Sequence, residues 1–431
     1  MKDYRSITEK CSCGCAHKLL TELIVSELGA TQRLIEYAFA YSSDPSQILI
    51  ICDENTKKYA LPIKASLGCE LYTFPENAHA NEIFTADLSA YIDDLPFSPT
   101  LMIACGSGSV HDITRFCAYK AKIPFVSYPT AASVDGFVSA VAAMTMYGQK
   151  LTYPSAAPIA LFADPDVYST APVRLTASGA GDVIGKITAL YDWRAAELLC
   201  GEALCPEIYG IMEEALDAVI KAAEHHADAR DFAEKVMNGL ILSGIAMQLQ
   251  GSSRPASGSE HHMSHFWEMH VINNETSALH GEKVGVGTVL ALDFIKNNID
   301  LLDRIDDIEL SSVFDKDMIR EIYGELSDGI IKENLPSGKT SSSAIAKLVS
   351  CKTSTLDELK RLTRKLPDAE KIRDLLASFG APSTLSELSL PDDVEFVKKS
   401  TIFSSYVRNR LTVAKIISAI TVSERRFGEK S

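Results

Sequence analysis

The chain has 431 residues, 46% of them hydrophobic, and its 42 Lys and Arg against 57 Asp and Glu give a formal net charge of −15 at pH 7. At about 150 residues per domain, this length predicts two or three domains with buried cores and excludes a mainly disordered chain. The negative charge argues against nucleic acid as a partner. No apolar run approaches the roughly 18 residues that cross a bilayer, so we expect no membrane insertion and a cytoplasmic location.

The first part of the chain alternates short apolar runs with segments of helical periodicity. Runs that are apolar on both faces are typical of buried parallel strands, and each run here ends in turn-forming residues. This alternation predicts a Rossmann-like α/β domain with a parallel sheet over residues 1–170. The clearest predicted strands are 48–52, 101–105 and 125–128.

The character of the sequence changes between residues 153 and 174. Prolines at 154, 158, 165 and 172 interrupt any helix there, around a short strand-like run at 159–162. Beyond them, long segments such as 211–249 and 356–379 have helical spacing. We therefore predict an all-α C-terminal domain over residues 171–431.

Three predicted strands end in residues that suit a nucleotide. The strand 101–105 ends in Gly106-Ser107-Gly108, just before a predicted helix at 113–120, and free N–H groups at such a helix start suit a pyrophosphate. Two-glycine turns also occur for geometric reasons alone. Asp53 follows another predicted strand. A carboxylate at such a position either accepts hydrogen bonds from ribose hydroxyls or caps a helix. The loop 129–136 adds small residues, hydroxyls and a carboxylate, so we expect the three strand ends to line one crevice.

Five of the ten histidines lie between residues 261 and 280, at 261, 262, 265, 270 and 280. If residues 260–270 are helical, His261 and His265 share a face, whereas His262 points about 100° away. A helical histidine pair with a third ligand forms an open divalent-metal site. Asp182, between glycines, is the candidate anionic ligand. The alternatives are histidines hydrogen-bonded within a core, and Asp182 as the N-cap of a helix.

Five motifs resemble, in order, the glycerol-1-phosphate dehydrogenases. They are GSGSVHD at 106–112, PTAASVDG at 129–136, GAGD at 179–182, SRPASGSEH at 253–261 and HGEKV at 280–284. The resemblance covers about residues 45–290, and SRPASGSEH selects the phosphate-using branch. These enzymes are similar to glycerol dehydrogenase and dehydroquinate synthase and group with the iron-dependent alcohol dehydrogenases. The resemblance implies a dehydroquinate synthase-like fold.

The resemblance also implies roles for individual residues. Asp182, His261 and His280 match the ligands of one divalent metal per subunit, usually zinc, with nickel or iron as alternatives. His265 and Asp135 match substrate-contacting positions, as does Asp182, and His265 joins the metal ligands as a catalytic candidate. The positions that line NAD(P)H are Asp53, Gly108, Ser109, Val110, His111, Asp112, Thr130, Ala131, Ala132, Ser133 and Ser139. His111 departs from the family, which often has a small aliphatic residue or Asn there.

The implied reaction is the interconversion of dihydroxyacetone phosphate and sn-glycerol 1-phosphate by hydride transfer at C2. A metal held by one carboxylate and two imidazoles keeps net positive charge and stabilises the alkoxide. Arg254, Lys186 or Lys283 is a candidate to bind the substrate phosphate. The alternatives are a glycerol dehydrogenase, a dehydroquinate synthase and a non-catalytic nucleotide-responsive binding protein. A homodimer is the default for such enzymes.

The segment from Cys11 to His17 offers four soft ligands within seven residues. The Cys-x-Cys-x-Cys spacing is poor for one tetrahedral zinc site, which favours a redox role or none. Cysteines inside apolar runs, such as Cys105 and Cys117, are expected to be buried thiols. We expect His225 and His226 to be a solvated pair. Arg408 and Arg410 are expected to face solvent or an anion.

Overall fold

The computed structural model describes residues 4, 6–11, 13–269, 277–307, 316–334 and 353–428. The chain packs as two compact units, the first of Met1–Val183 and Gly210–Ser252, the second of Ile184–Tyr209 and Ser253–Ser431. This division lies later than the boundary that the prolines indicate, and the first unit includes residues 210–252. Among the described residues, none of the helices combines the length and apolar content that a bilayer span requires.

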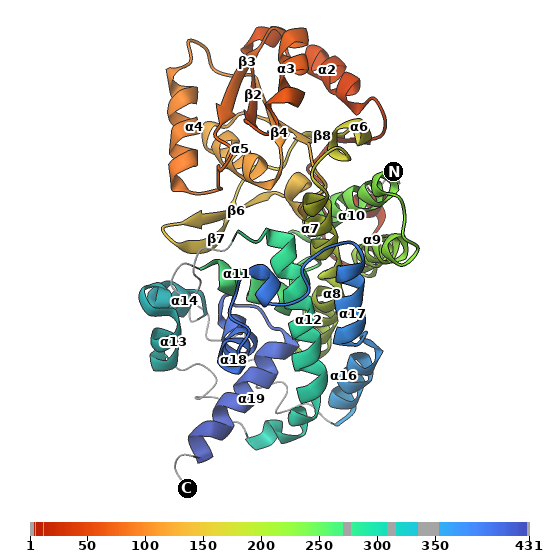
Figure 1. Ribbon diagram of the computed structural model, residues 1–431, viewed down its shortest axis with the longest axis vertical. Coiled ribbons are helices and arrows are strands. Elements are labelled where there is room, and N and C mark those ends of the chain that lie inside the picture. The colour runs from red at the N-terminus through yellow and green to blue at the C-terminus, as the bar shows by residue number, and fades with distance from the viewer. Residues whose placement is uncertain are drawn as a thin grey trace. The chain divides into compact units, whose positions relative to one another are not determined.

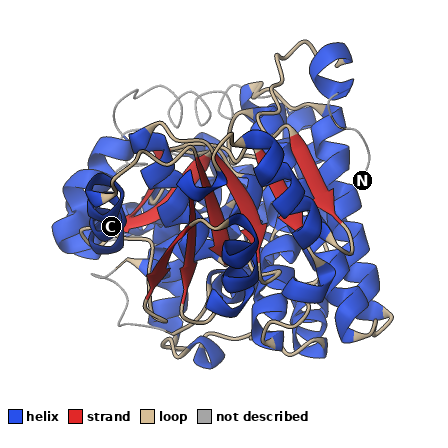
Figure 2. Ribbon diagram, turned by 90° about the horizontal axis from the view of Figure 1, so that it is seen from above, coloured by secondary structure: helices blue, strands red, loops and turns tan. Residues whose placement is uncertain are grey.

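A six-stranded sheet forms the centre of the first unit, with the order β1-β8-β5-β4-β2-β3 and parallel pairing throughout. Its strands lie side by side in Figure 2. They are β1 (Leu23–Ser26), β2 (Ile48–Asp53), β3 (Glu70–Phe74), β4 (Leu101–Gly106), β5 (Phe125–Pro129) and β8 (Ala160–Ala163). This pairing confirms the predicted parallel sheet. The central strands β4 and β5 are buried along their whole length.

Helices cover both faces of this sheet because successive strand residues point to opposite sides. Ile50 and Ile103 pack with α2 (Ala30–Tyr41) and α3 (Lys57–Leu67) on one face. The neighbouring residues of the same strands pack with α4 (Glu82–Asp94) and α5 (Gly108–Ala121) on the other (Figure 1). The other helices of this part of the chain are α1 (Ser6–Lys10), α6 (Pro165–Tyr168), α7 (Val173–Ile184), α9 (Pro206–Glu224) and α10 (Ala229–Gln250).

An antiparallel hairpin, which was not predicted from the sequence, lies between β5 and β8 in the chain. It pairs β6 (Val141–Met146) with β7 (Gln149–Pro154). The turn residues Tyr147 and Gly148 both have positive φ, 51° and 79°. Two successive residues of this kind match the right-handed twist of the strands, whereas a Tyr gives no turn signal in the sequence.

The second unit contains helices and no strand within its described residues, which confirms the predicted all-α region. The α-helices are α8 (Lys186–Cys200), α11 (Ser259–Glu268), α12 (His280–Asn298), α13 (Lys316–Tyr323), α14 (Ser327–Asn334), α16 (Thr353–Lys365), α17 (Ala369–Ser378), α18 (Val394–Phe403) and α19 (Val413–Gly428). One core lies around α8, α16 and α19, and a second lies around α11, α13 and α18.

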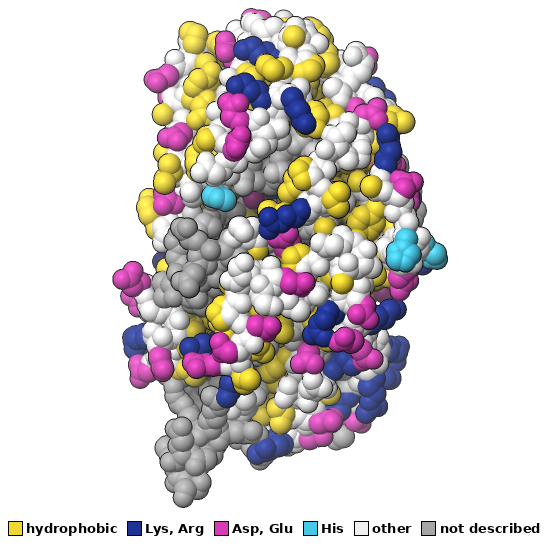
Figure 3. Space-filling view, in the orientation of Figure 1, with side chains coloured by type: hydrophobic (Ala, Val, Ile, Leu, Met, Phe, Trp, Pro, Cys, Tyr) yellow, Lys and Arg dark blue, Asp and Glu magenta, His cyan; other side chains and the backbone are white. Residues whose placement is uncertain are grey.

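Short 3-10 segments connect these elements in both units. They are η1 (Pro45–Gln47), η2 (Asp135–Val138), η3 (Ile299–Asp307), η5 (Gly324–Leu326), η6 (Ser386–Leu388) and η7 (Ser404–Tyr406). On the face seen in Figure 3, acidic and basic side chains are interspersed, so the net charge is not gathered there in one patch. Dispersed charge of this kind favours solubility rather than attraction of one charged partner.

Gly179 on α7 lies against the loop after β5. A Cβ at this position would lie 2.1 Å from the carbonyl oxygen of Ala132, a backbone atom that cannot move away by itself. We expect Gly179→Ala to lower the free energy of unfolding by about 1–3 kcal/mol, because overpacking forces the loop to shift. Urea unfolding followed by circular dichroism measures the change.

Gly210 on α9 is the matched control, since a Cβ there would meet nothing within 4 Å. Gly210→Ala should raise stability by about 0.5–1 kcal/mol through helix propensity alone. Equal stability changes in the two variants would contradict the close approach of α7 to the loop.

Candidate functional site

Three histidines come together in the second unit. His261 and His265 lie on α11, and His280 is the first residue of α12. The ring centroids are 5.3 Å apart for His261 and His280, and 6.0 Å apart for each of the other two pairs. The predicted helical pair of His261 and His265 is therefore confirmed, and His280 joins it from the next helix. Of the five clustered histidines, His270 lies outside the described residues.

Two glutamates fix the orientation of two of these rings. Glu260 Oε1 lies 2.7 Å from His261 Nδ1, and Glu268 Oε1 lies 3.2 Å from His280 Nδ1. An ionised carboxylate only accepts hydrogen bonds, so each Nδ1 carries the proton and each Nε2 carries the lone pair. Histidines that bind metals are usually held in this way, with the second ring nitrogen on a carboxylate or carbonyl.

Glu260 stays ionised although it is completely buried. Burial alone would raise its pKa, but the hydrogen bond and charge of His261, with donors from Thr188 and the Gly258 N–H, lower the pKa below its usual value. The Gly258 N–H donates to Glu260 Oε1 at 2.7 Å, the same oxygen that contacts His261 Nδ1. The anionic side chain is therefore available to hold the His261 ring at neutral pH.

Glu268 also pairs with a cation, because Lys283 Nζ lies 3.1 Å from the same Oε1 that contacts His280. One ligand atom each from His265, Glu268 and His280 lies within 4.8 Å of the other two. The second unit alone thus offers three nitrogens and a carboxylate as donors. Neutralisation by Lys283 makes Glu268 better suited to orient His280 than to bind a cation itself.

His262 and His265 are both buried and neutral. Burial, together with nearby positive charges, holds the pKa of each ring well below its usual value. For His262 these charges belong to Arg410, Lys415, Arg408 and Arg254, and for His265 the largest is Arg408. Within the described part of the chain, neither ring nitrogen of His262 has a hydrogen-bond partner, and the same holds for His265 Nδ1. His262, expected to be a bystander, therefore lies among four cations.

The three predicted phosphate-binding cations all contact protein acceptors. Lys186 Nζ donates to the Ala256 carbonyl at 2.9 Å, and Lys283 pairs with Glu268. Arg254 forms an ion pair with Glu202 at 2.8 Å and donates to two backbone carbonyls. These contacts stabilise the loop before α11. Arg410 also holds that loop, through the Ser257 carbonyl, and so is not a purely solvated surface group.

Asp182 lies in the first unit, in the last turn of α7. The expectation that it opens a helix, with the N-cap alternative, is wrong, because α7 begins nine residues earlier at Val173. Its Oδ2 accepts a hydrogen bond from the Asp135 N–H at 3.1 Å, and Asp135 Oδ2 accepts one from the Ser243 hydroxyl at 2.8 Å. The two predicted substrate-contacting aspartates are thus neighbours within this unit.

Most of the predicted cofactor residues lie after two strands of the first unit, β4 and β5, whereas Asp53 ends β2. Gly108 to Asp112 form the first turn of α5, and the preceding Ser107 side chain makes no capping hydrogen bond to that turn. Thr130 donates its N–H to the Gly106 carbonyl at 3.0 Å, which sets the loop 130–133 beside the turn. The buried Ser133 hydroxyl has no partner among the described residues. Uncapped helix N–H groups and a buried hydroxyl suit a phosphate-bearing cofactor.

Three predicted cofactor side chains have local partners instead. His111 contacts the Ser107 carbonyl at 2.9 Å and the Ser127 hydroxyl at 2.8 Å, and burial lowers its pKa to about 3. Asp53 Oδ1 accepts from the N–H of Thr56 at 2.8 Å and from its hydroxyl at 2.7 Å, within the turn before α3, whose N-cap is Thr56 and not Asp53. Ser139 bonds within its own turn. For these residues, contact with a cofactor stays a prediction.

Comparisons with known proteins agree with this architecture. The family model for iron-containing alcohol dehydrogenase matches residues 25–172. A glycerol-1-phosphate dehydrogenase [NAD(P)+] of Bacillus licheniformis is 35% identical over 432 residues, covering 97% of this chain and 95% of the relative. The chain belongs to the glycerol-1-phosphate dehydrogenase family. A Bacillus subtilis member is 41% identical over 283 residues, covering 63% of this chain and 71% of the relative.

A solved structure shows the same fold. Sulfoacetaldehyde reductase from Bifidobacterium kashiwanohense in complex with NAD+ matches with a TM-score of 0.59 and 16% sequence identity, covering 95% of this chain and 99% of that chain. The dehydroquinate synthase-like fold expected from the resemblance is therefore confirmed.

Sequence reasoning missed Asp192, which fixes the start of α11 for this member of the family. Asp192 on α8 is buried and accepts hydrogen bonds from the N–H and hydroxyl of Ser259, at 2.8 and 2.7 Å, and from the Val413 N–H at 2.8 Å. Burial raises its pKa to about 6 in spite of these donors. Nothing in the local pattern marks this residue, because α19, which supplies Val413, lies over 200 residues further along the chain.

We expect Asp192→Ala to lower the free energy of unfolding by about 3 kcal/mol or more, since it leaves two buried N–H groups without acceptors. Thermal unfolding at pH 7 measures the loss. Asp217→Ala is the matched control, because this exposed helical aspartate pairs only with Lys221 on the surface and should change stability little. A similarly small effect of Asp192→Ala would contradict the anchoring role.

Proposed function

We propose that the protein is a metal-dependent NAD(P)H oxidoreductase that interconverts dihydroxyacetone phosphate and sn-glycerol 1-phosphate by hydride transfer at C2. The glycerol-1-phosphate dehydrogenase [NAD(P)+] of Bacillus licheniformis supports the assignment through its near full-length similarity. The observation that carries the chemistry is the pair of imidazoles, His261 and His280, with a carboxylate on each Nδ1. This arrangement supports a metal-binding role for the two histidines, because such ligands usually have a carboxylate or carbonyl on the second ring nitrogen.

We assign one divalent metal per subunit to Asp182, His261 and His280, zinc before nickel or iron. Two neutral imidazoles and one carboxylate are a donor set that catalytic zinc accepts while a coordination position stays open. Each histidine turns its Nε2 lone pair away from its glutamate. The hydrogen bonds to the buried Glu260 and to the partly buried Glu268 keep these rings from rotating freely, so the donors are oriented before a metal binds.

NAD(P)H is assigned to the first turn of α5, the loop 130–133, Ser139 and Asp53. The uncapped N–H groups of that turn and the buried Ser133 hydroxyl suit the pyrophosphate. When bound, a divalent ion polarises the substrate carbonyl and the reduced nicotinamide supplies the hydride. Arg115 keeps this region in place, because its buried guanidinium donates to the Gly136 and Val141 carbonyls.

His265 and Asp135 are assigned to the substrate. The His265 ring is buried and neutral, and its Nδ1 has no partner among the described residues, so it is free to exchange a hydrogen bond with a substrate hydroxyl. Asp135 is held by the Ser243 hydroxyl, which fixes the direction of its carboxylate. Glu260 keeps the proton on His261 Nδ1 during turnover, so that ring is not consumed as a general base.

The substrate phosphate is assigned to the cations around His262. A phosphate dianion needs a local concentration of positive charge. In a chain of net charge −15, such a concentration requires several cations gathered at one place. Arg408 is the central candidate, because its charge acts on both His262 and His265. The unpaired ring nitrogens of His262 can add a hydrogen bond to a phosphate oxygen.

We also propose a cytoplasmic homodimer that acts on a small-molecule substrate, without nucleic acid as a partner. Closed two-fold dimers are the commonest assembly of soluble enzymes. Light scattering after gel filtration distinguishes a dimer from the 46.9 kDa monomer.

The metal assignment predicts that Asp182→Ala, His261→Ala and His280→Ala each remove the bound ion and lower kcat by at least about a thousandfold, because carbonyl polarisation is lost. Mass spectrometry of the metal in the purified protein and the rate of NADH oxidation give the two readouts. His225→Ala is the matched control, since this histidine is exposed in the turn after α9.

Glu268→Gln separates the assigned ligands from the competing donor in the second unit. As an orienting residue, it should weaken metal affinity by about 10–100-fold without abolishing metal binding. Full loss of the ion in Glu268→Gln, with retention in Asp182→Ala, would move the carboxylate ligand from Asp182 to Glu268.

The substrate assignment predicts faster turnover of dihydroxyacetone phosphate than of dihydroxyacetone, followed as NADH or NADPH oxidation. Arg408→Gln should raise KM for the phosphorylated substrate by at least about tenfold, while kcat and the rate with dihydroxyacetone change little. Arg320→Gln, at an exposed arginine on α13, is the matched control.

Two outcomes would redirect the assignment. Equal or better turnover of unphosphorylated glycerol would favour a glycerol dehydrogenase. A protein that binds the nucleotide but turns over neither substrate after zinc, nickel or iron is added would favour the non-catalytic nucleotide-responsive protein.

A further inference from the structure

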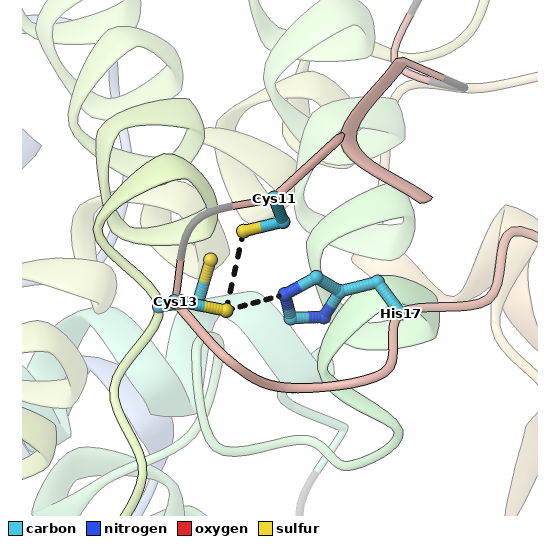
Figure 4. Close-up of side chains that lie close together, drawn as sticks. Cys11, Cys13 and His17 are labelled. Atoms are coloured by element: carbon cyan, nitrogen blue, oxygen red, sulfur yellow. Dashed lines mark hydrogen bonds between the residues drawn. The ribbon is translucent and has the colours of Figure 1, made fainter. Parts of the chain in front are cut away.

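A second group of soft donors lies near the N-terminus of the first unit. Cys11 Sγ is 3.2 Å from Cys13 Sγ, and Cys13 Sγ is 3.0 Å from His17 Nε2. Figure 4 shows these three side chains pointing toward one another. Two sulfurs and an imidazole nitrogen within 4.8 Å of one another are the donors that zinc and other soft ions prefer.

The His17 ring is oriented as a metal ligand would be. Its Nδ1 lies 2.8 Å from the Leu249 carbonyl at the end of α10. A carbonyl only accepts hydrogen bonds, so Nδ1 carries the proton and Nε2 presents its lone pair to the cysteines. The ring is buried, with 9% of its surface exposed, which keeps it in that orientation. A backbone carbonyl on the second nitrogen is a usual support for a metal-binding histidine.

The chain around the cluster is fixed to the same helix. Gln248 Oε1 accepts the N–H groups of Leu20 and Thr21, at 2.7 and 3.2 Å, and Gln248 donates to the Thr21 hydroxyl at 2.8 Å. Gly14 has a φ of 78°, a left-handed conformation that turns the chain back between Cys13 and His17. The sequence predicted a poor zinc site from the Cys-x-Cys spacing, whereas the structure brings both sulfurs and the His17 ring together.

We propose that Cys11, Cys13 and His17 bind one zinc ion, separate from the catalytic metal. Bonds of about 2.3 Å to sulfur and 2.0 Å to nitrogen would require the two sulfurs to part by about 0.5 Å for tetrahedral angles. Cys11 and Cys13 are only half-buried, so this adjustment meets little resistance. Water or Cys15, whose N–H already lies 3.3 Å from Cys13 Sγ, completes the coordination.

Bound zinc would link the segment before β1 to α10, since the ligands come from residues 11–17 and the support of His17 comes from Leu249. Metal binding adds its free energy to the folded state only, so it should reduce opening of this segment. Lys18, exposed beside His17, is a trypsin site that reports such opening.

The experiment uses the full-length, reduced protein, stripped of metal, incubated with excess Zn²⁺ and desalted, with zinc counted by mass spectrometry. In a His261→Ala background, about one zinc per chain should remain, and adding Cys13→Ser should remove about one equivalent. Adding Cys200→Ser instead, at a half-buried cysteine of the second unit, should leave the count unchanged. Co²⁺ in place of Zn²⁺ should give a thiolate-to-cobalt absorption band that Cys13→Ser abolishes.

Two further readouts separate this site from the proposed function. Cys13→Ser alone should retain turnover of dihydroxyacetone phosphate within about twofold, because it touches none of the proposed catalytic residues. Zinc should slow trypsin cleavage after Lys18 in the wild type and not in Cys13→Ser.

Equal zinc counts with and without Cys13→Ser would overturn the site, and so would a Cys11–Cys13 disulfide that persists under the reducing conditions used. Failure of the dehydrogenase assay would leave the zinc difference between the paired variants unaffected.

Discussion

The hydrogen bond from an imidazole Nδ1 to a glutamate is the interaction on which the candidate site depends. It occurs twice, between Glu260 and His261 and between Glu268 and His280. Each bond determines which ring nitrogen carries the proton, and thereby which one can donate a lone pair. A solvated histidine would interconvert its tautomers and rotate, so the free energy of ordering it would oppose metal binding.

A buried carboxylate is costly, and the surrounding helices are built to offset that cost. Glu260 receives donors from Thr188 on α8 and from the Gly258 N–H, besides His261. Asp192, also on α8, holds the first residue of α11 by two hydrogen bonds. The position of His261 and His265, the former proposed as a metal ligand, therefore follows from the packing of α8 against the start of α11. Local helix propensity alone would not place them.

Features with a simple periodicity could be predicted from the sequence. Strands β2 and β4 are apolar on both faces, and His261 and His265 are four residues apart on one helix, so both patterns needed only local information. Glu260 and Glu268 were missed because a carboxylate beside a histidine signals an interaction only when the ring directions are known. Asp182 was placed at a helix start because glycines flank it, although α7 tolerates them in its last turns.

His111 and the Cys11–His17 segment show how a partner distant in sequence decides a role. His111 lies in the glycine-containing motif 106–112, yet its ring is hydrogen-bonded to Ser127 on the next strand. The spacing of Cys11 and Cys13 argued against zinc, yet Leu249 orients His17 from more than 200 residues away. In neither case does the motif contain the residue that decides the outcome, so a single sequence could not have resolved it.

The two donor sets in this chain differ in chemistry in a way that keeps their functions apart. Thiolates are soft ligands that hold zinc tightly and leave it little positive charge to share with a substrate. Imidazoles with a single carboxylate leave the ion more positive, which is what polarisation of a carbonyl requires. Cys11 and Cys13 lie in the segment before β1, whereas the described surroundings of His261 and His280 contain carboxylates and cations. A stabilising ion and a reactive ion can therefore coexist without exchanging roles, because each set of donors favours one of the two tasks.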